Sequence, residues 1–348
     1  MTSSVISPAP LVSVVAVNYN CKAWLDRFFP SLQAQTIFDR IEVVLVDNTS
    51  TDGSDKICQE KMAGWTNGVF LATGGNFGYG GGCNRGAAVA RGKYLFFINP
   101  DVWLEPTCLE ELAKYCESSG AHIASPRVLD YDTDVLQLQG AAGFDIFGCM
   151  TRAHAGETLT EPFALAAFYF ITKELLLKAG GFDEQFFLYN EEMDLSWRVW
   201  IMGETIRQVP TARIHHQGAS SGNRVVENRT NENKRFWANR NQLLTLIKNG
   251  RFLLLGLVFT QLALMTAEAI AGSIMARRFS FARYSLFKPI ADCWRLRKHI
   301  MAERRRIRGI RKHGDLWILR KFFTFRFGRW MDVKLLMQAR GVKIDKAR

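Results

Sequence analysis

Two aspartates in the first third of the sequence stand where a folded chain could use them for chemistry. Asp47 and Asp101 each follow an apolar run that has the character of a buried strand. A carboxylate at the carboxyl end of a strand in an open α/β sheet lies at the edge where such sheets bind ligands. Asp47 is expected to accept a hydrogen bond from a base or ribose, or else to cap the next helix. Asp101 is expected to bind Mg²⁺ or Mn²⁺, which prefer oxygen ligands, unless Asn99-Pro100-Asp101 is simply a turn.

A glycine-rich stretch leads to Asp101, over residues 75–101 (GNFGYGGGCNRGAAVARGKYLFFINPD). Gly78 and the run 80–82 allow positive φ and a close approach of the backbone to a ligand. Asn84 and Arg85 supply hydrogen-bond donors at the start of the predicted helix, where an anion is favoured. A flexible loop that accepts phosphates, followed by a carboxylate at a strand end, indicates a nucleotide diphosphate held with a divalent metal ion.

Glu191, Glu192 and Asp194 form a second acidic group, at the start of a helix predicted over 191–202. The helix dipole favours acidic residues there, and Asp194 is spaced to pair with Arg198 one turn later. Because an exposed-looking aromatic segment precedes them, one of the two glutamates could also deprotonate a hydroxyl. We expect at least one carboxylate of this group to be functional.

Two adjacent histidines, His215 and His216, follow a predicted strand and precede a loop rich in glycine and serine. A single histidine is more often structural than a ligand, but the loop beside this pair indicates the rim of a site. One of the two is expected to complete a metal shell or to contact a phosphate.

Strands and helices alternate through the first half of the sequence at the spacing of βαβ units. This pattern predicts an α/β fold, Rossmann-like, with a mostly parallel sheet and helices on both faces. The turn-rich stretch that follows, at 122–170, predicts an antiparallel strand or hairpin. The strands are expected at 11–17, 41–46, 69–71 and 94–98, and the helices at 21–35, 105–117 and 191–202.

The composition separates a core from a basic C-terminal part. The 348 residues are 48% hydrophobic, and the seven cysteines include no CxxC pair, which indicates reduced thiols in the cytosol. Residues 277–348 contain 22 lysines and arginines against 5 acidic residues, a net charge of +17, whereas residues 1–276 carry −5. The first residues lack the basic and apolar segments of a secretory signal.

An apolar segment at 252–276 precedes the basic part and is long enough to span a bilayer. Glu268 would be unfavourable at the bilayer centre, so a helix lying in the interface fits about as well as a span. The mixture of basic and aromatic residues that follows is typical of helices that lie on anionic membranes. Exposed apolar helices also self-associate, so a homo-oligomer is a further expectation.

Two other classes of function are open at this point. The basic part could bind nucleic acid, although nucleic-acid readers usually spread basic residues over the folded domain, and no known module is recognised. The chain could also be a non-catalytic scaffold. The acidic residues at the predicted sheet edge favour an enzyme over either alternative.

Taken together, these motifs resemble the family 2 inverting glycosyltransferases, which have the GT-A fold. The resemblance covers roughly residues 12–221, and within the family the sequence is most similar to bacterial rhamnosyltransferases, with galactofuranosyltransferases next. The motifs that carry it lie at 12–20, 46–54 (VDNTSTDGS), 76–86, 98–101 (INPD), 180–187 (GGFDEQFF), 191–198 (EEMDLSWR) and His216.

The resemblance implies a metal site for Mg²⁺ or Mn²⁺. Asp101 matches the last acid of the family's DxD-type motif, which is shortened here to Asn99-Pro100-Asp101. His216 matches a late histidine near the metal and the diphosphate, and His215 is the adjacent alternative.

The resemblance also implies a catalytic base and a donor site. Glu192 stands where the family usually has an aspartate, so either Glu191 or Glu192 would be the base. The residues that would bind the nucleotide-sugar are Asn18, Asp47, Asn76, Gly78, Asn84, Arg85, Asn99 and Asp194.

The resemblance, together with the composition, charge and hydropathy of the two ends of the chain, gives expectations for the whole chain. Residues 1–10 would be a flexible lead-in, 11–250 the GT-A domain, and 251–348 membrane-associating helices on the cytoplasmic face of the plasma membrane. The best match for the donor is dTDP-L-rhamnose, with UDP-galactofuranose, UDP-glucose and UDP-N-acetylglucosamine as alternatives. The acceptor would be a hydroxyl of a lipid-linked or cell-surface glycan, carried on a polyprenyl diphosphate.

Overall fold

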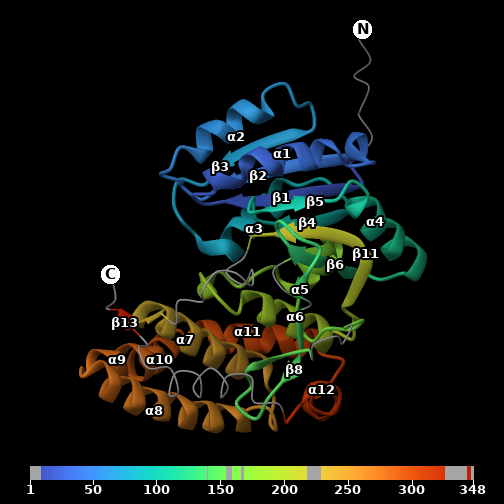
Figure 1. The fold of residues 1–348 in the computed structure, drawn as a ribbon. Helices are drawn as coiled ribbons and strands as arrows, with labels where there is room; N and C mark the ends of the chain where they lie inside the picture. The colour runs from blue at the N-terminus through green and yellow to red at the C-terminus, as the bar shows by residue number, and fades with distance from the viewer. Residues whose placement is uncertain are drawn as a thin grey trace. The chain divides into compact units, whose positions relative to one another are not determined.

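In a computed structural model, the chain is described over residues 9–138, 140–153, 159–165, 168–217, 229–325 and 343–345. It divides into two compact units, whose elements are labelled in Figure 1. The sheet unit comprises Met1–Leu138, Ala167–Glu184 and Arg207–Ser221, and the helical unit comprises Gln139–Ala166, Gln185–Ile206 and Gly222–Arg348. The domain limits expected after residues 10 and 250 stay a prediction.

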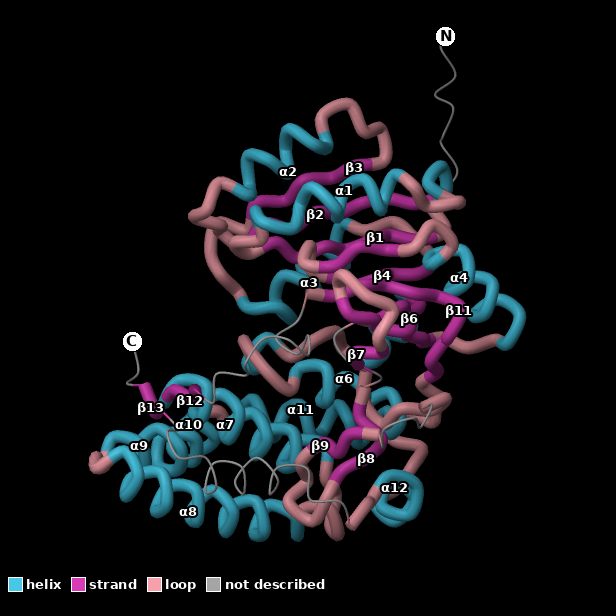
Figure 2. The backbone as a smooth tube through the Cα atoms, in the orientation of Figure 1, coloured by secondary structure: helices cyan, strands magenta, loops and turns pink. Residues whose placement is uncertain are grey.

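A mixed sheet of nine strands forms the centre of the sheet unit (Figure 2). The strand order is β3-β2-β1-β4-β10-β6-β11-β5, with β7 paired to β6. Strands β3, β2, β1 and β4 run parallel, and β10 lies antiparallel between β4 and β6. The bounds are β1 Val12–Asn18, β2 Ile41–Asp47, β3 Gly68–Ala72, β4 Tyr94–Ile98, β5 Val102–Leu104, β6 Ile123–Asp130, β7 Leu136–Leu138, β10 Tyr169–Thr172 and β11 Arg207–His216.

Helices cover both faces of this sheet, because the central strands are apolar on both sides. Every residue of β1 is buried. Val14 and Ala16 belong to the core that also holds side chains of α1, α2 and α4, whereas Val15 and Val17 face α3. The predicted α/β fold with a Rossmann-like sheet is therefore confirmed. The helices are α1 Leu25–Gln33, α2 Ser54–Met62, α3 Gly78–Val89, α4 Cys108–Ser119 and α5 Lys173–Ala179, with 3₁₀ turns at Lys22–Trp24, Phe38–Arg40 and Glu184–Phe186.

Most of the predicted glycine loop is a helix. α3 begins at Gly78, which has a φ of +71°, and the run 80–82 lies buried inside the helix. A Cβ atom added to Gly86 would lie 2.3 Å from Val15 Cγ1. These glycines let α3 pack closely on the sheet, so the prediction that the run 80–82 forms a flexible ligand-binding loop is wrong.

The helical unit holds one β-hairpin and a group of helices. One buried cluster of side chains in this unit is formed mainly by α7, α8, α10 and α11. The bounds are β8 Ala141–Phe144, β9 Met150–Arg152, α6 Glu191–Ile201, β12 Arg229–Asn231, α7 Glu232–Asn249, α8 Gly256–Ala276, α9 Ser280–Ala282, a π turn at Arg283–Phe287, α10 Lys288–Arg295, α11 Arg297–Ile310, α12 Asp315–Phe322 and β13 Lys343–Asp345.

α8 is long and apolar enough to cross a membrane, the only helix in the described ranges with that property. Gln261 and Glu268 of this helix lie on the side that packs against the protein. Gln261 is fully buried, and Glu268 is ion-paired with Arg235 of α7 at 3.4 Å. The opposite side carries exposed apolar residues, among them Phe259 and Ile274. α8 therefore has one protein-facing and one solvent-facing side.

The seven cysteines are all buried and unbridged. Burial raises the pKa of the thiols of Cys21, Cys58, Cys116 and Cys293 to about 12, and it raises the pKa of Cys108 as well. These thiols are therefore fully protonated at neutral pH.

Candidate active site

Asn18 and Asp47 meet at the carboxyl edge of the sheet, because β1 and β2 are parallel and in register at these two residues. Asn18 Nδ2 donates to Asp47 Oδ1 at 2.7 Å and to the hydroxyls of Ser50 and Ser54 at 3.0 and 2.9 Å. Asp47 Oδ2 accepts from the backbone N–H of Ser50 at 3.0 Å. Both side chains are buried, so this network shapes the β2–α2 turn as well as the sheet edge.

Three aspartates gather near this edge. Burial raises the pKa of the Cys21 thiol to about 12, and the negative charges of Asp101, Asp52 and Asp47 add to that rise. Asp52 accepts hydrogen bonds from the backbone N–H groups of Lys22 and Ser54, each at 3.0 Å. The edge is therefore acidic, which suits a metal cation better than a free phosphate.

Asp101 and His216 lie together at the end of β11. The backbone N–H of Gln217 donates to the Asp101 carbonyl at 2.9 Å, which fixes the two segments side by side. His216 Nε2 lies 3.4 Å from Asp101 Oδ2. Asp101 Oδ1 is buried and makes no hydrogen bond with any described residue. The two residues assigned to the metal from the sequence are thus adjacent.

Gln137 fixes which nitrogen of His216 carries the proton. Gln137 Nε2 donates to the His216 carbonyl at 3.0 Å, so Oε1 must face the ring, where it lies 2.7 Å from Nδ1. Since Oε1 can only accept, Nδ1 carries the hydrogen and Nε2 of the neutral ring presents its lone pair to Asp101. Two acceptors then face one another unless a proton or a metal cation lies between them. An orienting partner of this kind is typical of histidines that bind metals.

His215 belongs to a separate cluster, because successive strand residues point to opposite faces of the sheet. Its ring stacks on Trp103 with centroids 3.7 Å apart, and its Nε2 lies 3.3 Å from Glu105 Oε1. Ligand atoms of His215, Glu105 and Asp134 all lie within 4.8 Å of one another, so this group could also hold a metal ion. His215 and His216 therefore cannot both serve one site.

Most of the remaining donor-site candidates of the sheet unit lie around α3. Asn76 Oδ1 accepts from the Gly78 N–H at 2.9 Å and shapes the start of the helix. Asn84 holds the backbone of Phe182 through its side-chain oxygen and nitrogen, at 2.9 and 2.8 Å. Arg85 lies over the ring of Phe77, 3.5 Å from its centroid, and is ion-paired with Glu184 at 3.2 Å. Asn99 follows β4 and is half-buried.

Glu191 and Glu192 begin α6 in the helical unit. Glu191 is buried, and its Oε2 has no hydrogen-bond partner in the described part of the chain. Burial raises the pKa of Glu191 to about 8, with the charge of Glu192 as the second cause, and burial also raises the pKa of Glu192. A carboxyl group with a raised pKa can take up and release a proton near neutral pH.

Asp194 has a structural environment, in contrast to its predicted place among the donor-binding residues. Its side chain is fully buried. It pairs with Arg198 Nη2 at 2.9 Å and with Lys248 Nζ at 3.1 Å, and it accepts from Asn249 Nδ2 at 2.9 Å. A carboxylate enclosed in this way positions α6 against α7.

The loop before α6 is held in an unusual conformation. Phe187, Tyr189 and Asn190 all have positive φ, between 59° and 70°. The side-chain amide of Asn241 on α7 donates to the carbonyls of Phe186, Leu188 and Tyr189, at distances between 2.7 and 2.9 Å. Left-handed conformations at non-glycine residues cost free energy and persist only where the surroundings hold them. α7 therefore sets the start of α6.

Sequence reasoning missed α7 altogether. It supplies Lys248 and Asn249 to Asp194 and Asn241 to the loop. A signal was present, since α7 (ENKRFWANRNQLLTLIKN) combines many polar residues with only a short apolar run. Such a helix in the middle of a chain indicates buried polar contacts, although it does not name the partners.

Comparison with known proteins supports the same interpretation. A family model described as glycosyl transferase family 2 matches residues 13–190, just over half of the chain. The chain is 30% identical over 247 residues to an N-acetylglucosaminyl-diphospho-decaprenol L-rhamnosyltransferase of Mycobacterium tuberculosis, an alignment that covers 61% of this chain and 78% of the relative. The resemblance predicted from the motifs is therefore confirmed at the level of the family.

Solved structures show the same fold. A crystal structure of GalNAc-T7 with UDP, GalNAc and Mn²⁺ aligns with a TM-score of 0.57 at 18% identity, over 69% of this chain and 48% of that one. A crystal structure of TarS from S. aureus aligns with a TM-score of 0.51 at 15% identity, over 79% of this chain and 43% of that one. At these identities the likeness concerns the GT-A-like fold alone. With the family match over residues 13–190, it follows that this chain belongs to glycosyl transferase family 2.

Proposed function

We propose that the chain is a metal-dependent, inverting glycosyltransferase that moves a sugar from a nucleotide-diphosphate donor to a hydroxyl of a lipid-linked glycan. The single observation that carries this proposal is the pair of acceptor atoms, His216 Nε2 and Asp101 Oδ2, 3.4 Å apart at the sheet edge. Mg²⁺ or Mn²⁺ fits these ligands, and the imidazole nitrogen favours Mn²⁺ of the two. When bound, the ion would neutralise the charge that develops on the leaving diphosphate.

The proposed base is a carboxylate of the Glu191–Glu192 pair. It would take the proton of the acceptor hydroxyl, whose oxygen attacks the anomeric carbon from the face opposite the diphosphate. The configuration then inverts, and no covalent sugar–enzyme intermediate is needed. The raised pKa of the pair supports this role, because a base with a pKa near the working pH transfers protons most effectively.

The proposed donor is dTDP-L-rhamnose, bound at the carboxyl edge of the sheet. The similarity to a rhamnosyltransferase of M. tuberculosis supports this choice. UDP-galactofuranose, UDP-glucose and UDP-N-acetylglucosamine remain the alternatives. Contacts to the nucleotide would come from the edge residues Asn18, Asp47, Asn76, Gly78, Asn84, Arg85 and Asn99.

The proposed acceptor is a glycan on a polyprenyl diphosphate, reached at the cytoplasmic face of the plasma membrane. The relative of M. tuberculosis is named for such an acceptor. In this chain, α8 and the residues after it expose large apolar side chains, such as Phe259 and Trp294, which are 76% and 71% exposed. Exposed cations accompany them, including Arg277, Lys288 and Arg297. This combination suits an anionic membrane surface.

The test is transfer measured with purified full-length protein. The donors dTDP-L-rhamnose, UDP-galactofuranose, UDP-glucose and UDP-N-acetylglucosamine are supplied in turn with a short polyprenyl-diphosphate-linked N-acetylglucosamine, with Mn²⁺, Mg²⁺ or EDTA. We expect turnover of dTDP-L-rhamnose that EDTA abolishes. Asp101→Ala should lose activity at all metal concentrations. Gln137→Leu should raise the metal concentration for half-maximal rate about 10-fold or more, since partners that orient a metal ligand contribute that much.

Asp26→Ala is the matched control, because Asp26 is an exposed acid of the same unit whose side chain is 91% accessible. It should behave as the unsubstituted protein does. Turnover that persists in EDTA or in Asp101→Ala would contradict the metal site. Turnover of a UDP-sugar alone would keep the mechanism and replace the donor.

A further inference from the structure

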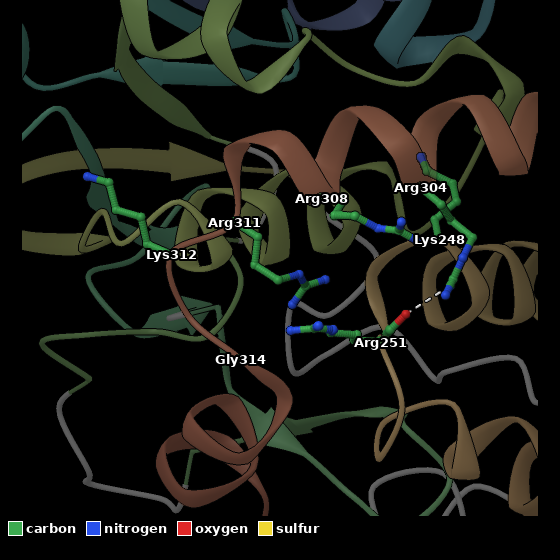
Figure 3. A pocket seen from close by; sticks show the side chains of 8 residues that line it. Lys248, Arg251, Arg304, Arg308, Arg311, Lys312 and Gly314 are labelled. Atoms are coloured by element: carbon green, nitrogen blue, oxygen red, sulfur yellow. Dashed lines mark hydrogen bonds between the residues drawn. The ribbon is translucent and has the colours of Figure 1, made fainter.

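A cavity of about 190 Å³ in the helical unit is lined almost entirely by cations (Figure 3). The cations come from the end of α7 and the turn after it, from α11, and from the turn that follows α11. Two glycines complete the lining. The cationic residues are Lys248, Arg251, Arg304, Arg308, Arg311 and Lys312.

Two of these arginines are anchored to the C-terminal end of α7. Arg304 Nη1 donates to the carbonyls of Ile247 and Gly250, the latter at 2.8 Å, and Arg311 Nη2 donates to the carbonyl of Asn249. The last carbonyls of a helix have no partner within the helix, so these contacts satisfy them. The arginines are therefore fixed in place, and the cavity is built rather than formed by chance on a mobile surface.

The cations of the cavity repel one another. Burial lowers the pKa of Arg304 and of Arg311, and the neighbouring charges of Arg308, Arg251 and Arg304 itself lower these pKa values further. Figure 3 shows the Arg251 and Arg311 side chains reaching toward each other, whereas the Lys312 amine points away. An arrangement that holds like charges together gains stability when an anion enters.

The described residues supply too few carboxylates to neutralise this cavity. Asp315 lies 3.7 Å from Arg311, but its oxygens already accept from the backbone N–H groups of Arg251, Phe252 and Leu254. Within the described ranges, no carboxylate lies within ion-pair distance of the guanidinium groups of Arg251 and Arg308. Both side chains are exposed and available to a ligand.

The rim of the cavity is apolar where the chain leaves it toward α8. Phe252 and Leu253, which follow Arg251 directly, are 74% and 59% exposed. The Arg251 guanidinium lies over the Phe252 ring, 5.0 Å from its centroid. A ligand that fits this surface has an anionic group for the cavity and an apolar chain for the rim.

We propose that this cavity binds the diphosphate of a prenyl-diphosphate-linked acceptor, with the prenyl chain along Phe252 and Leu253. Arginine forks pair with phosphate oxygens in two-point contacts, which a cluster of several arginines can offer to both phosphates at once. The proposal rests on the proposed function for its choice of an acceptor. It also connects with α6, since Lys248 of the cavity pairs with Asp194, two residues after Glu192.

The experiment measures binding of farnesyl diphosphate to the full-length protein by calorimetry, beside farnesyl monophosphate, farnesol and inorganic pyrophosphate. The test variant is Arg251→Ala with Arg308→Ala, because both side chains are exposed and neither is ion-paired with a described residue. The matched control is Arg305→Ala, an exposed arginine of the same helix that does not line the cavity. We expect farnesyl diphosphate to bind most tightly, farnesyl monophosphate less tightly and farnesol least. The double variant should lose about 10-fold or more per guanidinium, and Arg305→Ala should lose none.

Several outcomes would overturn the proposal. Equal affinity of the double variant and the unsubstituted protein for farnesyl diphosphate would place the diphosphate elsewhere. Competition by dTDP or UDP that is lost in the double variant would make the cavity a nucleotide site. If the double variant lost binding to phosphatidylglycerol vesicles but kept binding to farnesyl diphosphate, the cavity would be a contact for lipid headgroups. Pyrophosphate binding as tight as farnesyl diphosphate would remove the prenyl chain from the site.

This experiment separates the cavity from the proposed function, because it requires no sugar transfer. Arginine-dependent binding of farnesyl diphosphate in a protein that transfers no sugar would retain the cavity and reject the activity. Sugar transfer with a normal KM for the acceptor in the double variant would retain the activity and reject the cavity. The KM for the donor should be unchanged in either case.

Discussion

At the scale of single residues, the ionisation of Glu191 would link the proposed catalysis to stability. Its pKa is raised to about 8 in the folded chain, above the value of about 4.3 for an unperturbed glutamate. The folded state therefore binds a proton that the unfolded state releases between these two values. Since the native state holds more protons there, the free energy of unfolding falls as pH rises through that window. Folding therefore disfavours the ionised carboxylate of Glu191, which is the form that a general base requires.

The corresponding prediction concerns the pH profile of transfer. We expect kcat to rise with pH to a plateau, with a midpoint near 8, because the base must lose its proton first. Glutamine at the true base should lower kcat by about 10²–10⁴-fold. Glutamine at the other member of the pair should keep activity and move the midpoint to lower pH, because a neighbouring negative charge is gone. A flat profile between pH 6 and 9 would contradict the assignment.

Thermal unfolding at pH 8 provides the control for that experiment. Glu191→Gln should be at least as stable as the unsubstituted protein there, because the penalty for ionising a buried carboxyl is removed. Loss of activity with a lower melting temperature would instead mean that the substitution damaged the fold.

The site residues differ in how far the sequence could predict them. Asp101 and His216 were paired from motif positions, and they lie 3.4 Å apart. Gln137, which sets the His216 tautomer, comes from a short strand that no motif marks. The full burial of Asp194 was not predicted, because its partner Lys248 stands 54 residues later and burial by distant residues leaves no local signal.

At the scale of elements, α3 shows that a glycine-rich sequence can be interpreted either as a loop or as a helix. Glycine runs suit both a loop that approaches a ligand and a helix that approaches a strand. The four strands were predicted well, because apolar runs bounded by turns are a local pattern. Whether these glycines form a loop or a helix depends on how closely the segment packs on β1. That distance is determined only when the sheet is assembled.

The close approach of α3 leads to a prediction on stability. A Cβ at Gly86 would lie 2.3 Å from Val15 Cγ1 and 2.9 Å from Val46 Cγ2, so Gly86→Ala must displace the helix. We expect a net loss of about 1–2 kcal/mol, since overpacking costs about 1–3 kcal/mol and alanine regains up to ~1 kcal/mol of helix propensity. Urea unfolding monitored by circular dichroism would measure it.

Gly309→Ala is the matched control, because an added Cβ at Gly309 of α11 meets nothing within 4 Å. Alanine there should be neutral or stabilise the protein by up to ~1 kcal/mol. Equal effects of the two substitutions would mean that α3 can move without cost, and that its glycines do not serve packing.

At the scale of the whole molecule, charge is concentrated in the part that also exposes apolar residues. Residues 277–348 carry +17, and residues 1–276 carry −5. α8 keeps Glu268 on its protein side, paired with Arg235. A helix packed in this way would have to break an ion pair to cross a bilayer alone, which favours an interfacial position over a span.

Vesicle sedimentation tests this position. The full-length protein should pellet with phosphatidylglycerol vesicles and dissociate as salt rises, because charge screening weakens the contact. Phe259→Ser with Trp294→Ser should weaken binding about 10-fold or more, since each removes apolar surface that would leave water. The control is Leu177→Ser in α5, which is 66% exposed on the sheet unit. If the double variant bound the vesicles as tightly as the unsubstituted protein, this surface would be excluded as the membrane anchor.

The buried thiols bear on how the protein ages in storage. Oxidation and alkylation proceed through the thiolate, and all seven cysteines are enclosed, five of them with raised pKa values. In air the thiols of the folded protein therefore do not react, whereas each molecule that unfolds exposes seven reactive thiols at once. The shelf life of a preparation is then set by the frequency of unfolding and not by the redox poise of the buffer.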